Sequence, residues 1–258
     1  MQTKSTKIIA SAIFAIVSAG QPGFAEDTAQ DTRAVSFSGM IGAGYGPTFE
    51  GSDKSEALAV FDFNASFAGG RYFAGTQGIG FAPVLTDELT VKIALGYGGG
   101  RAVKDDPTRL AGLGDIDDEA LAILSTEYRM GQIAFGAEVT GGADYGTTAK
   151  IAVSTGVECT DRITLGGEIN ATYADGQHMQ RYFGVSGAQS AASGKAIYSA
   201  DSGLKSVGIS LGASIKVTEA TSIEFGAEHQ RLMEDAKNSP ITLEAGQTFA
   251  FLGVSARF

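Results

Sequence analysis

Residues 206–228 read SVGISLGASIKVTEATSIEFGAE, and the spacing of their apolar side chains decides the fold class. Every second residue from Val207 to Val217 is apolar, and small or polar residues stand between them. After a short polar turn the same rhythm resumes at Ile223. Successive side chains of a strand point to opposite faces of a sheet, so this alternation predicts β-strands whose two faces meet different surroundings.

The same two-residue rhythm covers most of the chain and predicts an all-β protein. The segments run about ten to thirteen residues, whereas strands of soluble proteins typically have about five or six. A tilted strand that crosses a membrane needs roughly 9–11 residues. The expected strands are residues 34–46, 57–67, 71–83, 88–98, 118–130, 132–142, 147–159, 162–174, 204–217, 221–233 and 247–258.

The connections between these strands alternate in length. VTEAT, CTDR, RMGQ and LTDE are tight turns, while residues 99–117, 175–203 and 234–246 form long connections. Transmembrane barrels have short periplasmic turns and longer outer loops. Backbone groups in hydrocarbon must be paired, which a closed antiparallel sheet achieves without free edges. We therefore expect a transmembrane β-barrel with one face in lipid and a polar lumen.

The number of strands follows from where the two termini lie. Both termini of such a barrel belong in the periplasm, which requires an even number of strands. The glycine-rich stretch 69–85 is the place for a reversal beyond the segments named above, because glycine permits tight turns. We expect twelve strands, with ten as the alternative.

The two ends of the chain carry targeting signals. Lys4 and Lys7 precede the apolar stretch IIASAIFAIVS, and GQPGFA ends in the small residues that signal peptidase reads. We expect a signal peptide at 1–25, a periplasmic segment at 26–33 and a single barrel at 34–258. The terminal Phe258, preceded by alternating apolar residues, resembles the signal that the outer-membrane insertion machinery recognises. The protein should therefore reside in the outer membrane of a Gram-negative bacterium.

Composition excludes several classes of function. The formal net charge of −10 argues against nucleic acid as a partner, because phosphates select for basic patches. Cys159 is the single cysteine, so no intramolecular disulfide is possible. One cysteine and two histidines do not support a zinc site. We expect no catalytic, cofactor-binding or metal-binding residues.

Two patterns contain residue types that occur in chemical sites. His178 precedes Ser186 by eight residues, but FGVSGA has Ala188 where a nucleophile elbow needs glycine, and no strand-to-helix turn is expected there. The acidic stretch 104–119 does not match a calcium loop and is better explained as a solvated outer loop that meets cation-bridged lipopolysaccharide. The chain is therefore expected not to be an enzyme, and the sequence assigns no role to His178, His229 or Cys159.

Charged side chains fall on the inward parity of the strands. They predict either a solvated, partly ion-paired interior, which is the simpler account, or the lining of a narrow channel. The residues are Lys92, Glu138, Lys150, Glu158, Glu168, Lys216, Glu224 and Glu228.

Four separate stretches make the sequence resemble the MipA/OmpV family of outer-membrane proteins. They are PTFEGSD (47–53), LAGLGDID (110–117), YFGVSGAQSAASGKAIYSADSGLK (182–205) and RLMEDAKNSPI (231–241). Within the last stretch the matching residues are Leu232, Asp235, Ala236, Ser239 and Pro240. Phe49 stands where the family pattern has Tyr, and the chain has no Trp, so Tyr and Phe must supply any interfacial girdle.

The resemblance implies a function that needs no residue chemistry. The family is named after a protein that interacts with the murein lytic transglycosylase MltA, which implies a scaffold joining that hydrolase to a penicillin-binding murein synthase. The contact surface would be the periplasmic turns and rim. The alternative is a narrow pore, or a surface-exposed receptor or adhesin that binds through its long loops. Outer-membrane lipid and lipopolysaccharide are the remaining expected partners.

Overall fold

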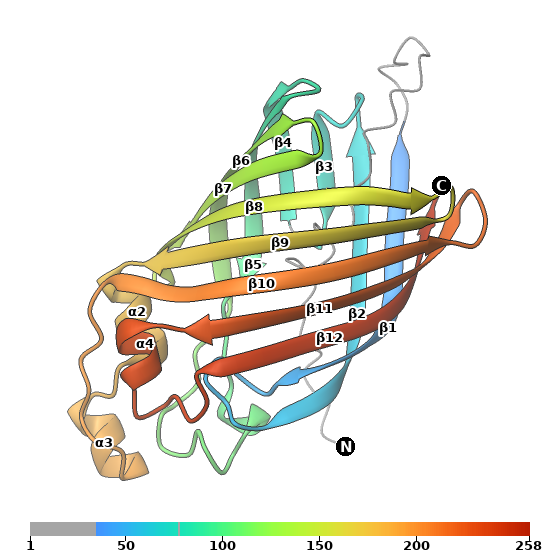
Figure 1. Ribbon diagram of the computed structural model, residues 1–258. Helices are drawn as coiled ribbons and strands as arrows, with labels where there is room; N and C mark the ends of the chain where they lie inside the picture. Colours follow the sequence, from blue (N-terminus) through green and yellow to red (C-terminus); the bar gives the residue numbers. More distant parts are fainter. Residues whose placement is uncertain (1–34, 77) are drawn as a thin grey trace.

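The computed structural model describes residues 35–76 and 78–258. Within them, twelve antiparallel strands form one closed barrel in which each strand pairs with its neighbour in sequence and β1 pairs with β12 (Figure 1). The strands are β1 Ser36–Pro47, β2 Ser55–Phe67, β3 Tyr72–Gly75, β4 Gly78–Leu85, β5 Leu89–Gly98, β6 Glu119–Met130, β7 Ile133–Gly142, β8 Gly146–Thr160, β9 Ile163–Ala174, β10 Gly203–Lys216, β11 Thr221–Leu232 and β12 Gly246–Arg257.

The expected reversal inside residues 69–85 is present as the hairpin β3–β4. A turn at Ala68, Gly69 and Gly70 with positive φ leads into β3, and Gly78, also with positive φ, begins β4. Glycine reaches this backbone region without the steric penalty that other residues meet. The expectation of twelve strands is therefore confirmed, and ten is excluded.

The two faces of the strands are those that the sequence pattern predicts. In β10, Leu211 is 62% exposed on the outer surface, while the adjacent Ser210 is 1% exposed on the inner surface. Ser210 stands opposite Glu168 of β9 and Glu228 of β11, so polar residues share the inner face across three strands. Residues 206–228 thus face lipid with their apolar side chains and the lumen with their polar ones.

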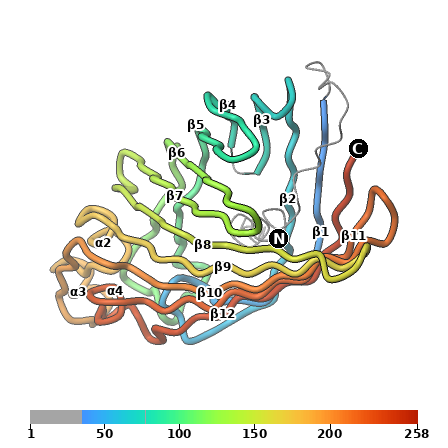
Figure 2. The backbone as a smooth tube through the Cα atoms, turned by 45° about the horizontal axis from the view of Figure 1, so that its top comes forward, coloured from blue at the N-terminus to red at the C-terminus, as the bar shows by residue number. Residues whose placement is uncertain are grey.

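The lengths of the connections divide the barrel into two different ends. The turns after β2, β4, β6, β8 and β10 span two to four residues and form the periplasmic rim, together with Phe258. Phe258 exchanges two backbone hydrogen bonds with Phe37, of 2.9 and 3.1 Å, and its side chain is 84% exposed. The long connections lie at the opposite end, where the helices gather (Figure 2).

The long connections contain short helices that the sequence pattern did not predict. They are α2 Gly176–Phe183, α3 Gly187–Ser193, α4 Glu234–Asn238 and the 3₁₀ turn η1 Val103–Asp105. Each spans at most eight residues, too few to display a clear helical period in the sequence. In the part of the chain that the structure describes, no helix has the length and apolar character needed to cross a membrane.

No strand lies between α2 and α3 in the described part of the chain, and Val185 forms only an isolated bridge with Tyr198. Ser186 caps the helix α3 that follows, a role that the sequence did not predict. The bridge is isolated and has no strand alternation around it, so only the fold reveals it. The expected signal peptide, its cleavage after Ala25 and the segment 26–33 lie outside the described residues and stay predictions.

The outward and inward faces can be separated with two adjacent residues of β6. Leu124 is 49% exposed on the lipid face, whereas Ser125 faces the lumen between Lys92 and Glu138. Leu124→Arg should lower the free energy of unfolding in lipid vesicles by about 2–4 kcal/mol, because it places a charge in hydrocarbon. Ser125→Arg should cost clearly less, since lumenal water and Glu138 receive its charge. A denaturant titration measures both, and equal losses would contradict the assignment of faces.

Candidate functional site

Four connections that are far apart in the sequence form one structure at the outer end of the barrel, which we call the outer cap. Its parts are residues 48–54, 99–118, 175–202 and 233–245. All four lie at the same rim, because in an antiparallel barrel every second connection is at the same end. The cap is therefore assembled by the barrel and not by local sequence.

An apolar core holds the four parts of the cap together. Its buried members are Phe49, Leu110, Leu113, Val185 and Ile241, at least one from each connection. Leu110, Val185 and Ile241 are each at most 1% exposed. Burial of such side chains contributes about 1.5–3 kcal/mol each, which is enough to order loops that lack a ladder of their own.

A second apolar cluster packs α2 and α4 onto the strand ends. Met179 and Phe183 of α2 contact Ala236 of α4, and all three are fully buried. Ala174 at the end of β9 and Leu232 at the end of β11 complete the contact. The two helices thus pack together at the outer ends of the strands, α2 against β8 and α4 against β10 (Figure 2).

Short side chains define where the helices of the cap begin. The carboxylate of Asp175 accepts a hydrogen bond of 2.8 Å from the backbone N–H of His178, and Ser186 forms a capping box with Gln189. Burial raises the pKa of Asp175, but the hydrogen bonds from His178 and Thr147 lower this pKa by more, so its net value lies below the usual one. These caps satisfy N–H groups that a helix leaves unpaired at its first turn.

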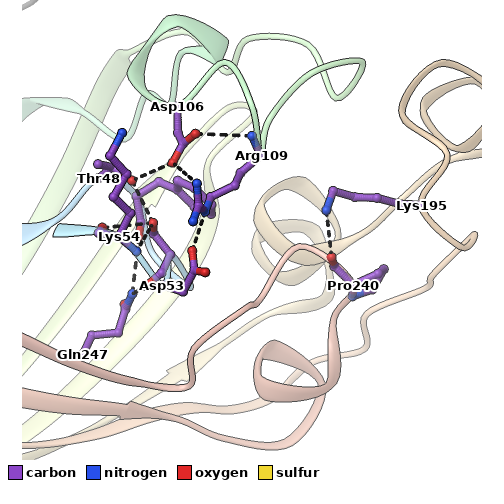
Figure 3. A network of polar contacts seen from close by, with 10 residues as sticks. Thr48, Asp53, Lys54, Asp106, Arg109, Lys195, Pro240 and Gln247 are labelled. Carbon is purple, nitrogen blue, oxygen red and sulfur yellow. Dashed lines mark hydrogen bonds and ion pairs between the residues drawn. The ribbon is translucent and has the colours of Figure 1, made fainter.

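Polar contacts join the β1–β2 connection to the β5–β6 connection (Figure 3). Arg109 forms an ion pair with Asp53 and lies 3.5 Å from Asp106, while Thr48 donates to Asp106 at 3.5 Å. The hydrogen bond from Arg109 lowers the pKa of Asp53. In the same view Lys195 donates to the backbone oxygen of Pro240 at 3.1 Å, which joins the other two connections.

The underside of the cap carries charged and aromatic residues at the mouth of the lumen. Glu50 accepts hydrogen bonds from Lys205 at 2.9 Å and from Gln230 at 3.0 Å. Burial raises the pKa of Glu50, but its charged and hydrogen-bonding neighbours, Lys205 first among them, together lower it more, so the carboxylate stays ionised. Arg101 is only 8% exposed and donates to the backbone oxygen of Tyr182 at 2.9 Å. These contacts tie the cap to β10 and β11.

His178 is a buried neutral histidine of the cap. It is 2% exposed, and its Nδ1 lies 3.1 Å from the backbone oxygen of Tyr145, which assigns the proton to Nδ1. Burial and the nearby Lys205 lower the pKa of His178 to about 4. Its ring packs on Tyr145 and Tyr182 at centroid distances of 4.7 and 4.4 Å. Its Nε2 has no hydrogen-bond partner among residues 35–76 and 78–258.

The other residues that the sequence left without a role are now placed. The Ser186 hydroxyl accepts from the Gln189 N–H at 3.3 Å, a helix-capping role, and no contact joins it to His178 among the described residues. Nδ1 of His229 lies 2.9 Å from the Thr248 hydroxyl on the outer half of the sheet. Cys159 is exposed near the periplasmic rim. The structure therefore does not bring these residues together.

The inward charges form local pairs in the lumen. Lys150 pairs with Glu168 at 2.8 Å, and Asn170 donates to Glu168 at 3.0 Å. Glu224 accepts from Ser214 at 3.0 Å and from Ser255 at 2.7 Å. Within the described part of the chain no group of three or more His, Cys, Asp or Glu side chains is placed to hold a metal ion.

Comparison with known proteins places the fold in a family. The family model described as MltA-interacting protein MipA matches residues 40–258. The chain belongs to the MipA family. The four stretches that carry the sequence resemblance are the same four that supply Phe49, Leu110, Val185 and Ile241 to the core of the cap. The stretches that carry the resemblance thus all contribute to the outer cap.

Solved structures show distant likenesses, and no curated protein matches the chain. An outer membrane channel from Pseudomonas putida F1 is 12% identical, with 90% of this chain and 99% of that chain covered and a TM-score of 0.43. The NanC porin is 7% identical, with 86% of this chain and 99% of that chain covered and a TM-score of 0.39.

The neutral state of His178 makes the cap of this MipA-family protein sensitive to acid. Because its pKa is about 4 in the cap and 6.5 when unfolded, the opened cap binds the proton first as the pH falls. The free energy of opening the cap is therefore highest above pH 6.5 and falls toward pH 4. At pH 5 it is lower by about 2 kcal/mol. Amide exchange across α2 at pH 7.5 and 5 measures this. His178→Asn, which keeps a donor toward Tyr145, should remove most of the dependence, whereas the exposed control His229→Asn should not.

Proposed function

We propose that this protein is a non-enzymatic scaffold of the outer membrane that holds a murein lytic transglycosylase near a penicillin-binding murein synthase. The family description, MltA-interacting protein, carries the proposal. The polar side chains singled out as catalytic candidates also have structural roles, since Ser186 caps a helix and His178 is buried in the cap. Contact with a partner then depends on surface shape and charge.

The periplasmic rim is the surface on which murein enzymes would dock. Its turns are short, which makes the rim a rigid ring and not a set of adaptable loops. Charges of both signs are exposed along this ring, at Arg71, Asp87, Glu88, Arg162 and Glu219. A mixed ring of this kind favours orientation of a partner and rapid association over deep apolar burial.

Photo-crosslinking from two exposed alanines tests the scaffold proposal in intact cells. A photoreactive residue at Ala220, in the turn between β10 and β11, should capture a lytic transglycosylase and a murein synthase. The same residue at Ala191, on α3 of the outer cap, should capture neither. Mass spectrometry identifies the products. Capture of murein enzymes from Ala191 alone, or from neither position, would contradict the proposal.

A narrow pore is the second candidate, and the polar inner face favours it. Polar residues line the sheet from Ser210 to Glu168 and Lys150, although ion pairs and the outer cap narrow the path. The double variant Asp53→Asn, Asp106→Asn, which removes the partners of Arg109, should raise single-channel conductance in planar bilayers by loosening the cap. The control is Ala191→Ser, at an exposed position of α3. If neither the wild type nor the loosened variant conducts, the pore is excluded.

A further inference from the structure

The wall of the barrel is incomplete in its outer half, between β2 and β5. The hairpin β3–β4 has strands of 4 and 8 residues, whereas β2 has 13 and β5 has 10. β3 pairs with β2 only from Asn64 to Phe67. From Ser55 to Phe63, β2 is paired on one side with β1, and no described strand lies against its other side.

The backbone groups that face this side can be assigned from the ladder. Thr48 N–H donates to Lys54 O at 2.9 Å, so even-numbered residues of β2 bond to β1 and odd-numbered residues point away from it. Phe63 O accepts from Thr76 N–H at 2.9 Å at the tip of the hairpin. Beyond that point, the N–H and C=O groups of Ala57, Ala59 and Phe61 have no backbone partner among residues 35–76 and 78–258.

This unpaired edge lies at the level of the apolar belt. Ala57 is in register with Tyr45 and Ala250, and Ala59 is in register with Ala43 and Leu252. Tyr45 and Leu252 are 58% and 52% exposed on the outer surface. Strand edges facing lipid do not persist in the hydrocarbon region, because their polar groups find no water there. Polar groups from the lumen or from the membrane must therefore form hydrogen bonds with the β2 edge.

The unpaired stretch has a defined frame. β5 lies across the gap from β2. At this level β3 and β4 are absent, so β2 and β5 are three strand spacings apart, which is about 14 Å. The hairpin tip bounds it toward the periplasm. Toward the outside, the ion pair of Arg109 with Asp53 and the contact of Thr48 with Asp106 close the frame (Figure 3).

The two sides of this frame differ in chemistry. On the lipid side, Ile79, Leu95 and Tyr97 are 61%, 62% and 74% exposed. On the lumen side, Asp62 accepts a hydrogen bond from Thr76, and Lys92 lies with its Nζ 5.7 Å from the centre of the Phe73 ring. The free donors and acceptors of β2 stand between an apolar outer rim and a polar inner one.

We propose that this stretch is a lateral opening that binds an amphiphile with one alkyl chain, its polar head in the lumen against the β2 edge and its chain in the outer leaflet. A polar head satisfies the N–H and C=O groups of Ala57, Ala59 and Phe61, and the alkyl chain lies along the apolar rim at Leu95 and Tyr97. The opening gives the capped lumen a second exit. This inference depends on neither the scaffold nor the conducting pore, because binding at the edge requires no partner protein and no ion current.

Amide exchange in nanodiscs made without choline lipids tests the opening and its ligand. Amides 57, 59 and 61 of the mature protein should exchange at least about tenfold faster than those of Ala250 and Leu252, which lie at the same level in a fully paired strand. Lauroyl lysophosphatidylcholine should slow only amides 57, 59 and 61, and glycerophosphocholine, the head group alone, should slow none. Fast exchange that the lysolipid leaves unchanged would overturn the ligand assignment.

A proline pair tests the unpaired edge without any ligand. Ala57→Pro removes an N–H that points away from β1, so the variant should assemble as the wild type does, judged by heat-modifiable migration on gels. Ala250→Pro, at the same level, removes a ladder hydrogen bond to β1 and should assemble poorly. Equal failure of both variants, or slow exchange at residues 57–61, would overturn the opening.

Discussion

The pairing of backbone N–H and C=O groups inside hydrocarbon is the constraint on which the rest of the structure depends. Water is absent there, so every strand needs a neighbour on each side, and the sheet must close. The closure between β1 and β12 runs from Ser38 opposite Arg257 to Tyr45 opposite Ala250. Closure in turn fixes which side chains face lipid and which face the lumen, because neighbouring strands in register share the same parity.

Closure also produces the outer cap. A ring of antiparallel strands delivers alternate connections to one rim, so residues separated by more than a hundred positions in sequence become neighbours there. Above the rim the solvent is water, and the rules of soluble proteins apply: Phe49, Leu110, Val185 and Ile241 form an apolar core, and Asp175 and Ser186 cap helices. The same chain thus uses an outward apolar face in the membrane and an inward apolar core outside it.

Among the described strands, the pairing is interrupted in the outer half of the wall between β2 and β5. The short hairpin β3–β4 leaves the edge of β2 unpaired at Ala57, Ala59 and Phe61, within the described residues, while the cap above is closed by Arg109 and its partners. The closed cap leaves the short periplasmic turns as the surface at which the proposed scaffold would meet its partners. A lateral gap at the level of the outer leaflet is suited to a molecule that is polar at one end and apolar along the rest.

The sequence by itself determined the barrel. Alternation such as that around Ser210 and Leu211 is a local property, since side-chain direction in a strand depends only on position, and it predicted the faces, the twelve strands and the reversal near Gly69 and Gly70. Strand length and the order of short and long connections predicted the membrane. The four family stretches were also visible in the sequence, but their meeting in one cap was not.

Only the tertiary structure decided the helices of the cap, the burial of His178, the helix-capping role of Ser186 and the unpaired edge of β2. Each of these depends on contacts between segments far apart in the chain, and a local pattern of apolar and polar residues carries no information about such contacts.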